Sequence, residues 1–394
     1  MKQVKLFRIT TIPLSLNVLL RGQLAFLNRH FRVTGISSPG AELEEVRERE
    51  GIEVRAIKME REIALAQDWR SLLALIRLFR KERPEIVHAN TPKASLLAMI
   101  AARWTRVPLR IYTVTGLRFE GFPPSLKRKI LVNMERLTCA MATHVIPEGN
   151  GVKDALYKNR VTRKELNVVA NGNINGVDTR YFSPSAIAPS DLMQVRLQYS
   201  IEAGDFVFCF VGRLVRDKGI VELYQAFAQL AAEHTGLKLL LVGPFEHTGN
   251  ALPDDIVEKI KSHKQIITTG FQSDIRPFLG ISHTFVFPSY REGFPNVVMQ
   301  AGAMELPCIV TDINGSNEIV QPGVNGLIIG TGSVPALYDA MSALFSDRHK
   351  LELLKSKSRT MIEDRYEQEY VWAQLLNRYR EYLAEKKIPF TADV

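Results

Sequence analysis

Cysteine, long apolar runs and dinucleotide-binding motifs are all scarce in this sequence of 394 residues. Its three cysteines, Cys139, Cys209 and Cys308, are widely spaced and form no C-x-x-C pair. This spacing excludes a cysteine-based metal site or redox pair and favours a reducing compartment such as the cytoplasm. No apolar run reaches the ~20 residues that are needed to cross a bilayer, so we expect no transmembrane helix.

The apolar segment 12–20 follows basic residues and superficially resembles a signal peptide. Pro13, Ser15 and Asn17 interrupt it, Arg21 follows it, and it has no small-x-small cleavage site. We therefore predict a first strand and loop here rather than an export signal.

The positive charge of the chain is concentrated in its first half. Residues 1–190 contain 31 Lys and Arg against 17 Asp and Glu, a balance of +14, and residues 191–394 contain 20 against 25, a balance of −5, which together give the net +9. A basic half indicates a nucleic acid, an anionic membrane or a phosphorylated substrate as partner. No nucleic-acid-binding motif accompanies the charge, so we expect no nucleic-acid partner.

One stretch of the basic half mixes aromatic and cationic side chains. Phe119, Phe122 and Leu126 lie beside a cluster of cations, namely Lys127, Arg128, Lys129 and Arg136. Two interpretations remain open: a patch that contacts an anionic membrane, or an ordinary helix face whose apolar residues point inward.

Short β-branched runs alternate with helical patterns along most of the chain. Strands are expected at 4–9, 33–37, 86–89, 111–114 and 144–146, and again at 206–211, 237–242, 266–269, 284–288 and 309–311. This alternation is typical of α/β proteins with parallel, doubly wound sheets. The stretch SPSAIAPS at 183–190 has no period and is predicted to be a linker.

These patterns predict two Rossmann-like domains, at 1–185 and at 191–365. A long helical pattern in 366–394 is expected to pack back on the first domain. Ligands of doubly wound sheets bind at the carboxyl ends of the strands, so the two domains are expected to face each other across a ligand-binding cleft.

The first motif with chemical content is VGRLVRDKGI at 211–220, between a predicted strand and a predicted helix. Gly212 and Gly219 let the backbone approach a ligand closely, and Arg213 and Lys218 bring two cations to it. A diphosphate is the expected ligand, although two cations near a turn are more often surface residues. The motif is neither G-x-G-x-x-G nor a P-loop, which argues against those two kinds of nucleotide site.

The second motif is PSYREGFPNVVMQA at 288–301, which follows another predicted strand. Pro295 stands where a helix would begin, since that position tolerates a missing N–H. The N–H groups of Gly293, Phe294 and Asn296, with the positive end of the helix dipole, are suited to an anion or to sugar hydroxyls. Glu292 directly precedes these groups.

With IVHANTPKA at 86–94 and NGVDTRYF at 175–182, these motifs make nearly the whole chain resemble the retaining glycosyltransferases of family 4. The continuous match SYREGFPNVVMQAGAMELPCIVTDINGSNEIV at 289–320 is especially specific. The resemblance implies the GT-B fold, in which two Rossmann-like domains face each other across a cleft. It implies that the N-terminal domain, 1–185, binds the acceptor and that the C-terminal domain, 191–365, binds the nucleotide-sugar donor. It also implies a role of the kind found in bacterial capsular polysaccharide or O-antigen biosynthesis.

By this resemblance the catalytic residues are Arg213, Lys218 and Glu292. The two cations would hold the donor diphosphate and stabilise the departing nucleotide in place of a metal, and Glu292 would bind hydroxyls of the donor sugar. Negative charge develops on the diphosphate as the sugar–phosphate bond breaks, so fixed cations there act on the transition state.

The sequence has no D-x-D motif, and we expect no metal and no cofactor. The other donor-binding residues would be Gly212, Gly243, Phe271, Gly293, Phe294, Pro295, Asn296 and Gln300.

The sequence departs from the family pattern at two positions. Where the family has a second Glu eight residues after the first, this chain has Gln300, whose amide can still bond a ribose hydroxyl. Where many members have His before a Gly, Thr115 precedes Gly116, which leaves room for a different or 6-deoxy sugar. The glycine-rich loop after the first strand is reduced to Gly22, and His88 is either a site residue or a structural histidine. The residues assigned to the acceptor or sugar side are Gly22, His88, Thr115 and Gly116.

The leading interpretation is a retaining, metal-independent transferase that moves a hexose, N-acetylhexosamine or 6-deoxyhexose from a UDP-linked donor. The basic first domain favours a polyprenyl-diphosphate-linked glycan as acceptor, at the inner face of the cytoplasmic membrane. No protein nucleophile is evident, so the nucleotide diphosphate itself would act as base toward the acceptor hydroxyl. Two alternatives remain: a nucleotide-sugar 2-epimerase with a related two-domain fold, and a non-catalytic nucleotide-sugar-binding protein, which Gln300 and Thr115 suggest.

Overall fold

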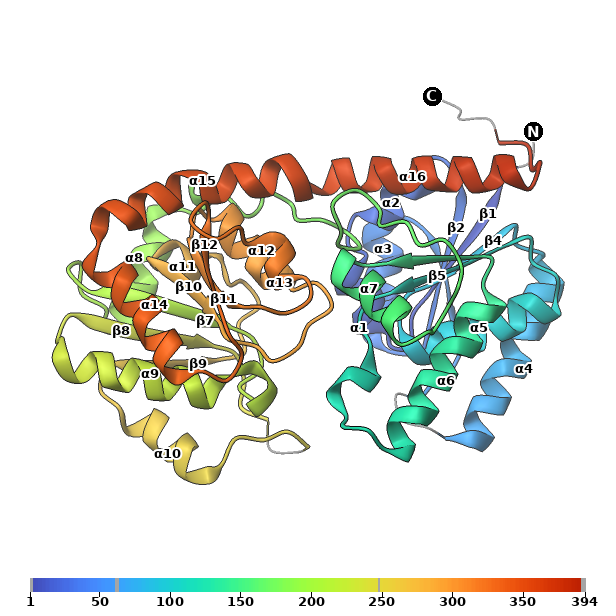
Figure 1. Cartoon of the computed structure of the whole chain (residues 1–394). Helices are drawn as coiled ribbons and strands as arrows, with labels where there is room; N and C mark the ends of the chain where they lie inside the picture. Colours follow the sequence, from blue (N-terminus) through green and yellow to red (C-terminus); the bar gives the residue numbers. More distant parts are fainter. Residues whose placement is uncertain (1–2, 61–63, 247–248, 391–394) are drawn as a thin grey trace. The chain divides into compact units, whose positions relative to one another are not determined.

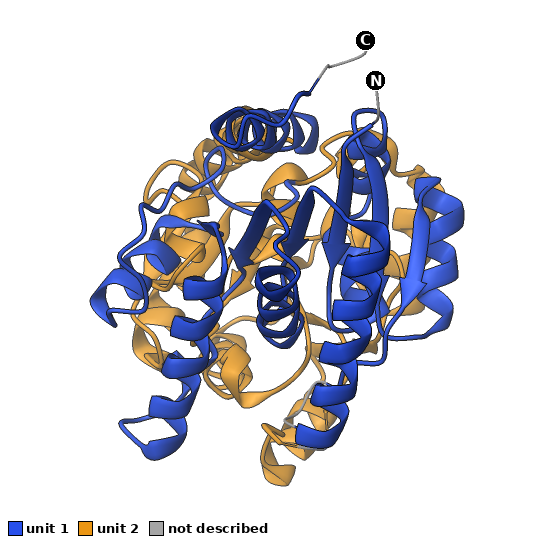
Figure 2. Cartoon of the chain, turned by 90° about the vertical axis from the view of Figure 1, so that its right-hand side faces the viewer, with its two compact units in different colours: residues 1–176, 368–394 blue, residues 177–367 orange. Residues whose placement is uncertain are grey.

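The computed structural model describes residues 3–60, 64–246 and 249–390. Two six-stranded sheets, parallel throughout, alternate with helices along the chain (Figure 1). Contacts divide the chain into unit 1, Met1–Gly176 with Gln368–Val394, and unit 2, Val177–Glu367 (Figure 2). The α/β, doubly wound fold class expected from the sequence is confirmed.

Unit 1 has the strand order β3-β2-β1-β4-β5-β6. Its strands are β1 (Lys5–Ile9), β2 (Arg32–Ser37), β3 (Glu53–Ala56), β4 (Ile86–Ala89), β5 (Leu109–Val114) and β6 (His144–Pro147). Its helices are α1 (Pro13–Leu19), α2 (Gln23–Asn28), α3 (Ala41–Glu50), α4 (Leu65–Glu82), α5 (Pro92–Trp104), α6 (Leu126–Met141), α7 (Asn150–Lys158) and α16 (Gln368–Glu385), with a 3₁₀ turn η1 (Arg118–Gly121).

Unit 2 has the order β12-β11-β10-β7-β8-β9, which repeats the connectivity of unit 1 when it is counted from β7. Its strands are β7 (Phe206–Val211), β8 (Leu237–Val242), β9 (Ile266–Gly270), β10 (Thr284–Phe287), β11 (Cys308–Thr311) and β12 (Gly326–Ile329). Its helices are α8 (Pro189–Gln198), α9 (Ile220–Glu233), α10 (Asp254–Ser262), α11 (Arg276–Gly280), α12 (Asn296–Ala303), α13 (Ser316–Ile319), α14 (Val334–Ser346) and α15 (Arg348–Tyr366), with 3₁₀ turns η2 (Pro184–Ala186) and η3 (Arg216–Lys218).

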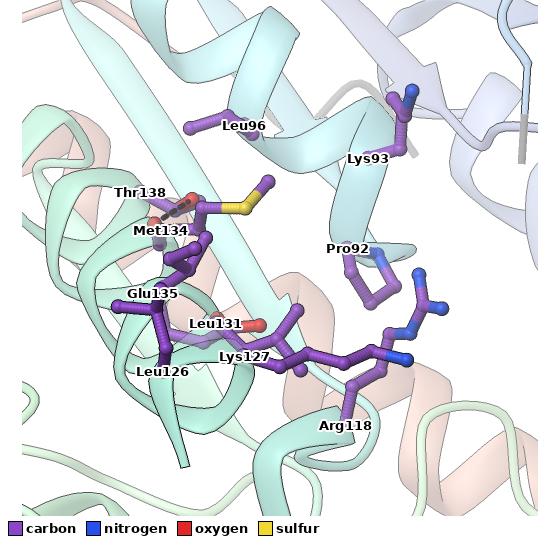
Figure 3. Close-up of a pocket in the computed structure, with 11 residues that line it drawn as sticks. Pro92, Lys93, Leu96, Arg118, Leu126, Lys127, Leu131, Met134, Glu135 and Thr138 are labelled. Carbon is purple, nitrogen blue, oxygen red and sulfur yellow. Dashed lines mark hydrogen bonds between the residues drawn. The ribbon is translucent and has the colours of Figure 1, made fainter. Parts of the chain in front are cut away.

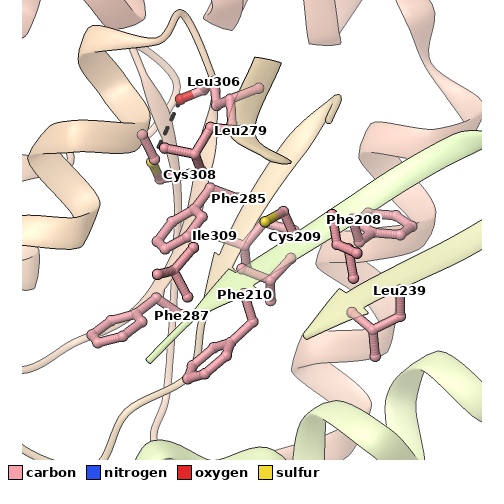
Figure 4. Close-up of a cluster of buried hydrophobic side chains, with 14 of the residues drawn as sticks. Phe208, Cys209, Phe210, Leu239, Leu279, Phe285, Phe287, Leu306, Cys308 and Ile309 are labelled. Carbon is pink, nitrogen blue, oxygen red and sulfur yellow. Dashed lines mark hydrogen bonds between the residues drawn. The ribbon is translucent and has the colours of Figure 1, made fainter. Parts of the chain in front are cut away.

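The central strands of unit 2 are apolar on both faces because helices cover both sides of a parallel sheet. All six residues of β7 are buried. Figure 4 shows Phe208 and Phe210 of β7 in one cluster with Phe285 and Phe287 of β10. The rings of Phe210 and Phe287 stack with centroids 5.7 Å apart. This packing holds β7 beside β10, where the strand order reverses, and the loops at the carboxyl ends of such a pair form the usual ligand site.

The boundary between the units lies earlier in the chain than the predicted linker 183–190. The Val177 N–H donates to the carbonyl of Tyr366 at 2.8 Å, which ties the start of unit 2 to the end of α15. Ile187, in the middle of the predicted linker, is buried in the core of unit 2. The small residues of 183–190 show no helix or strand period, and this absence predicted a linker. The packing of Ile187 shows that the segment belongs to unit 2.

The C-terminal helix α16 belongs to unit 1. α15 precedes it in unit 2, and the chain then enters unit 1 as α16, which lies against α2. In α16 the Trp372 indole N–H donates to Asn175 Oδ1 at 2.7 Å, and Tyr379 is fully buried against Phe31. The last residues of the segment 366–394, numbers 391–394, lie outside the described residues. Among the helices described, none combines the length and apolar character required to cross a membrane.

Candidate functional site

Two loops meet at the carboxyl ends of β7 and β10 in unit 2. One loop contains Arg213 and Lys218, and the other contains Glu292. The Tyr290 N–H donates to the carbonyl of Asp217 at 2.8 Å, and Ser289 Oγ lies 3.2 Å from the same oxygen. The structure therefore brings together the two motifs that the sequence separates by about seventy residues.

An ion pair joins the two motifs. Lys218 Nζ bonds to Glu292 Oε1, and each side chain is only 17% exposed. The buried Ser289 hydroxyl donates to the same carboxylate oxygen at 2.7 Å, and Lys218 Nζ lies 5.0 Å from the centre of the Phe287 ring. Two donors, Lys218 and Ser289, thus hold Glu292. Ser289 lies within the sequence motif, but sequence reasoning did not single it out.

Gly219 makes this approach of the loops possible. Its φ is +69°, in the left-handed region, and a Cβ at this position would overlap the carbonyl oxygen of Pro288. Backbone oxygen cannot swing away as the end of a flexible side chain could. Glycine is therefore required both for the turn that ends η3 and for the contact that presents Lys218 beside Glu292.

Arg213 is the more exposed of the two cations, at 59%. Its Nη1 bonds to both carboxylate oxygens of Glu246, at 2.8 and 3.0 Å. Glu246 follows β8. Gly243 lets this loop lie close to the Arg213 loop, since a Cβ on Gly243 would overlap the carbonyl oxygen of Gly212. Sequence reasoning missed Glu246, since only the meeting of these loops shows that it faces the cation.

The loop after Glu292 leads into α12. Pro295 caps this helix and Asn296 is its first residue, one position later than the sequence suggested. Phe294 is buried against Tyr366, with ring centroids 5.5 Å apart, and therefore contributes its backbone rather than its side chain to the surface. Asn296 and Gln300 are four residues apart on α12, so they share one face of the helix.

Phe271 follows β9 and is 78% exposed. A backbone bridge joins Gly270 to Gly243, so the loop that carries Phe271 starts beside the loop that follows β8. An exposed aromatic ring at the end of a parallel strand is suited to stacking on a base. The predicted donor-binding residues thus lie on loops at the carboxyl edge of one sheet or on the first two turns of α12.

In unit 1 the structure gives His88 a packing role. Its Nδ1 bonds to the Tyr379 hydroxyl at 2.6 Å and its Nε2 to the Thr113 hydroxyl at 2.6 Å. Burial, followed by the charge of Arg8, holds the pKa of His88 well below its usual value, so the ring is neutral. With both nitrogens engaged inside the protein, this residue matches the structural alternative rather than the site assignment.

Gly22 is also accounted for by packing. Its φ is +78°, its N–H donates to Glu50 Oε1 at 2.9 Å, and a Cβ would lie 2.6 Å from the Trp372 ring. Thr115 and Gly116 follow β5, and the Thr115 hydroxyl donates to the carbonyl of Asn90 at 3.2 Å. Of the four residues assigned to the acceptor or sugar side, Thr115 and Gly116 thus lie on the loop at the carboxyl end of β5 in unit 1.

Comparison with known proteins adds a family to this geometry. Residues 20–172 match the family model "Glycosyl transferase 4-like domain", and residues 194–361 match "Glycosyl transferases group 1". The capsular polysaccharide biosynthesis glycosyltransferase CapM of Staphylococcus aureus is 33% identical over 390 residues, which cover 98% of this chain and 100% of CapM.

A second relative and a solved structure agree with this match. The Escherichia coli UDP-Gal:alpha-D-GlcNAc-diphosphoundecaprenol alpha-1,3-galactosyltransferase is 30% identical over 306 residues, 77% of this chain and 76% of that enzyme. The crystal structure of Anabaena HepE in complex with UDP and glucose superposes with a TM-score of 0.79 at 20% identity and covers 96% of this chain and 100% of HepE. This last likeness concerns the fold.

Proposed function

We propose that this chain, which belongs to glycosyltransferase family 4 and has the GT-B fold, transfers a hexose, N-acetylhexosamine or 6-deoxyhexose from a UDP-linked donor to a saccharide carried on a polyprenyl diphosphate. The transfer retains the configuration of the donor sugar and uses no metal ion. The product is a growing cell-surface polysaccharide, as the name of the relative CapM suggests, made at the inner face of the cytoplasmic membrane.

The observation that carries the proposal is the Lys218–Glu292 ion pair, with Arg213 on the same loop as Lys218. A nucleotide sugar has an anionic diphosphate next to a ring of hydroxyls, and this pair offers a cation to the first and a carboxylate to the second. A diphosphate that binds Lys218 competes with Glu292 for it. Glu292 is then able to accept hydrogen bonds from the sugar hydroxyls.

The same residues act on the transition state. As the sugar–phosphate bond breaks, negative charge grows on the diphosphate, and Arg213 and Lys218 stabilise it where it forms. Glu292 is bonded to Lys218 and Ser289, and we therefore assign it to holding the sugar rather than to attacking it. The departing diphosphate accepts the proton of the acceptor hydroxyl on the face it leaves, which retains the configuration.

The proposed acceptor rests on charge and on one relative. The galactosyltransferase of Escherichia coli is named for UDP-Gal and a diphosphoundecaprenol-linked GlcNAc. In this chain the excess of positive charge lies in residues 1–190, which steers an anionic lipid substrate to unit 1.

The test is a transfer assay with a panel of UDP-, GDP- and dTDP-sugars and a diphosphate-lipid-linked acceptor, in the presence of EDTA. We expect one UDP-sugar to be consumed only with acceptor, and nuclear magnetic resonance to show the donor's anomeric configuration in the product. A strict metal requirement would contradict the roles of Arg213 and Lys218. Epimerised sugar formed without acceptor would identify the 2-epimerase, and a thermal shift with no turnover would identify a binding protein.

A further inference from the structure

A pocket of about 340 Å³ lies in unit 1, outside the donor-binding loops of unit 2. It is formed between the first turns of α5 and most of α6, with η1 at one end. Figure 3 shows Leu96 of α5 and Met134 of α6 on facing sides, and Lys127 and Arg118 together at the other end. The pocket is lined by Pro92, Lys93, Leu96, Arg118, Leu126, Lys127, Ile130, Leu131, Met134, Glu135 and Thr138.

The walls of the pocket are hydrocarbon. Leu96, Ile130, Leu131 and Met134 provide branched and flexible side chains that pack well against an irregular apolar ligand. Glu135 is the one carboxyl group in the lining, and its Oε2 accepts the Tyr112 hydroxyl at 2.8 Å. Burial raises the pKa of Glu135 to about 7, so the carboxyl is largely uncharged below neutral pH.

The mouth of the pocket combines exposed apolar side chains with cations. Leu126 is 74% exposed and Ile130 is 47% exposed, both on the first two turns of α6. Lys127 lies between them in sequence, with its Nζ 4.3 Å from the centre of the Phe122 ring, and Arg118 reaches the same end from η1. An amphiphile with an anionic head would place its head at these cations and its chain in the pocket.

The same edge of unit 1 continues onto α4. Because α4, α5 and α6 connect parallel strands, each begins at the carboxyl edge of the sheet. Lys93 of α5 bonds to Asp68 of α4 at 2.7 Å, which holds these two helix starts together. Leu65 and Trp69 at the start of α4 are exposed, so apolar surface extends beyond the pocket itself. Large exposed apolar patches of this kind mark sites of interaction with a partner or a membrane.

We propose that the α5–α6 pocket holds the phosphate-proximal isoprene units of a polyprenyl diphosphate, with Lys127 and Arg118 facing its phosphates. This inference rests on the proposed function for the identity of the lipid, but the pocket itself is a separate site. Inorganic phosphate alone would use only the cations, and an uncharged hydrocarbon would use only the walls. A branched chain joined to a diphosphate uses both.

The binding test uses a fluorescent C20 isoprenyl diphosphate below its micellar concentration, without vesicles. We expect the full chain to bind it, inorganic phosphate not to compete, and Ile130→Asp and Leu126→Asp to weaken binding by about tenfold, since each buries a charge against the hydrocarbon. Leu126 is mostly exposed, so that variant keeps the fold. Leu137→Asp is the matched control: Leu137 is 42% exposed on the same helix and is not among the lining residues, and binding should not change.

The transfer test separates this inference from the proposed function. With a long-chain lipid-linked acceptor, Ile130→Asp should raise KM about tenfold at constant kcat, and with a short-chain, water-soluble acceptor it should change neither. Isoprenyl diphosphate binding that responds to these variants supports the pocket even if no transfer to a lipid acceptor is found. The inference is overturned if wild type transfers sugar but does not bind the probe, if phosphate alone displaces it, or if the protein binds only to anionic vesicles.

Discussion

In the proposed function, the donor site depends most directly on Lys218. It reaches Glu292 across two loops and is one of the two cations assigned to the diphosphate. Lys218→Met keeps the length of the side chain but removes its charge, so we expect kcat to fall by ~10²–10³, as for the loss of one group that stabilises a transition state. Lys259→Met, at an exposed lysine of α10, is the control and should keep full activity. Activity within threefold of wild type in Lys218→Met would refute the assignment.

In the proposed function, Glu246 competes with a diphosphate for Arg213. Exposed ion pairs are worth about 0.2–1 kcal/mol, so breaking this pair should tighten UDP binding by up to about fivefold. We expect Glu246→Gln to lower the Kd measured by calorimetry, and the gain to shrink at high salt. Glu258→Gln, at an exposed position on α10, should leave the Kd unchanged. Weaker binding in Glu246→Gln would indicate that Glu246 contacts the donor itself.

The sequence singled out the charged residues of this candidate site but not their partners. Arg213, Lys218 and Glu292 stand in motifs whose glycines, spacing and position after a strand point to an anion and a sugar. Ser289 and Glu246 have no such signal, because their roles arise only where loops from different strands meet. For the same reason sequence reasoning could not decide between the two roles of His88, which became clear only from its contact with Tyr379, 291 residues away.

At the scale of elements, Gly219 links the turn after β7 to the loop after β10. Gly219→Ala would place a residue in the left-handed region, which costs about 1–2 kcal/mol, and would push its Cβ into the Pro288 carbonyl. We expect the free energy of unfolding, measured with urea, to fall by at least about 2 kcal/mol, together with a loss of transfer activity. Gly330→Ala is the control, since no atom lies within 4 Å of its Cβ position. Equal stability of the two variants would contradict this.

α6 carries a second testable feature, the buried carboxyl of Glu135. Its pKa is raised from 4.5 to about 7, chiefly by burial. The folded chain therefore binds a proton that the unfolded chain has released, and stability falls as pH rises from about 4.5 to 7. This group alone should lower the free energy of unfolding by up to about 3 kcal/mol between pH 5 and 8.

Glu135→Gln should remove that part of the pH dependence, so that its stability relative to wild type improves as the pH rises from 5 to 8. Urea unfolding at both pH values measures the change. Glu352→Gln, at an exposed position on α15, should follow wild type at each pH. A Glu135→Gln variant whose stability changes with pH as wild type does would show that Glu135 titrates normally.

The two strands that sequence reasoning missed, β3 and β12, each lie at one edge of a sheet. β3 is short and mostly exposed, whereas the strands at the opposite edges, β6 and β9, were predicted. The sequence pattern for a strand in a parallel sheet is an apolar run, which reflects burial on both faces. β3 has little of that burial and therefore little of the pattern, whereas β7, buried at every residue, was predicted with its observed bounds.

At the scale of the whole chain, unit 1 is completed by residues from the C-terminal end. Tyr379 of α16 accepts a hydrogen bond from Arg8 Nη1 at 2.9 Å and bonds to His88 Nδ1 at 2.6 Å, and all three side chains are buried. Arg8 is fully buried on β1, and its other partner is Asn90 Oδ1 at 3.0 Å. The Tyr379 hydroxyl thus joins β1 and β4 to a helix that the chain reaches only after it has passed through unit 2.

Tyr379→Phe removes this hydroxyl and leaves the buried Arg8 Nη1 and His88 Nδ1 without this partner. Such a loss costs about 1–3 kcal/mol, more where a charged group is involved. We expect amide hydrogen exchange to speed up in β1, β4 and α16, while exchange in β7 and β8 of unit 2 stays as in wild type. Tyr382→Phe on the same helix is the control, because Tyr382 contacts His144 through its ring, with centroids 3.7 Å apart. An equal rise of exchange in both units would show that α16 stabilises the whole chain as one cooperative body, and no rise in either would show that Arg8 and His88 find other partners.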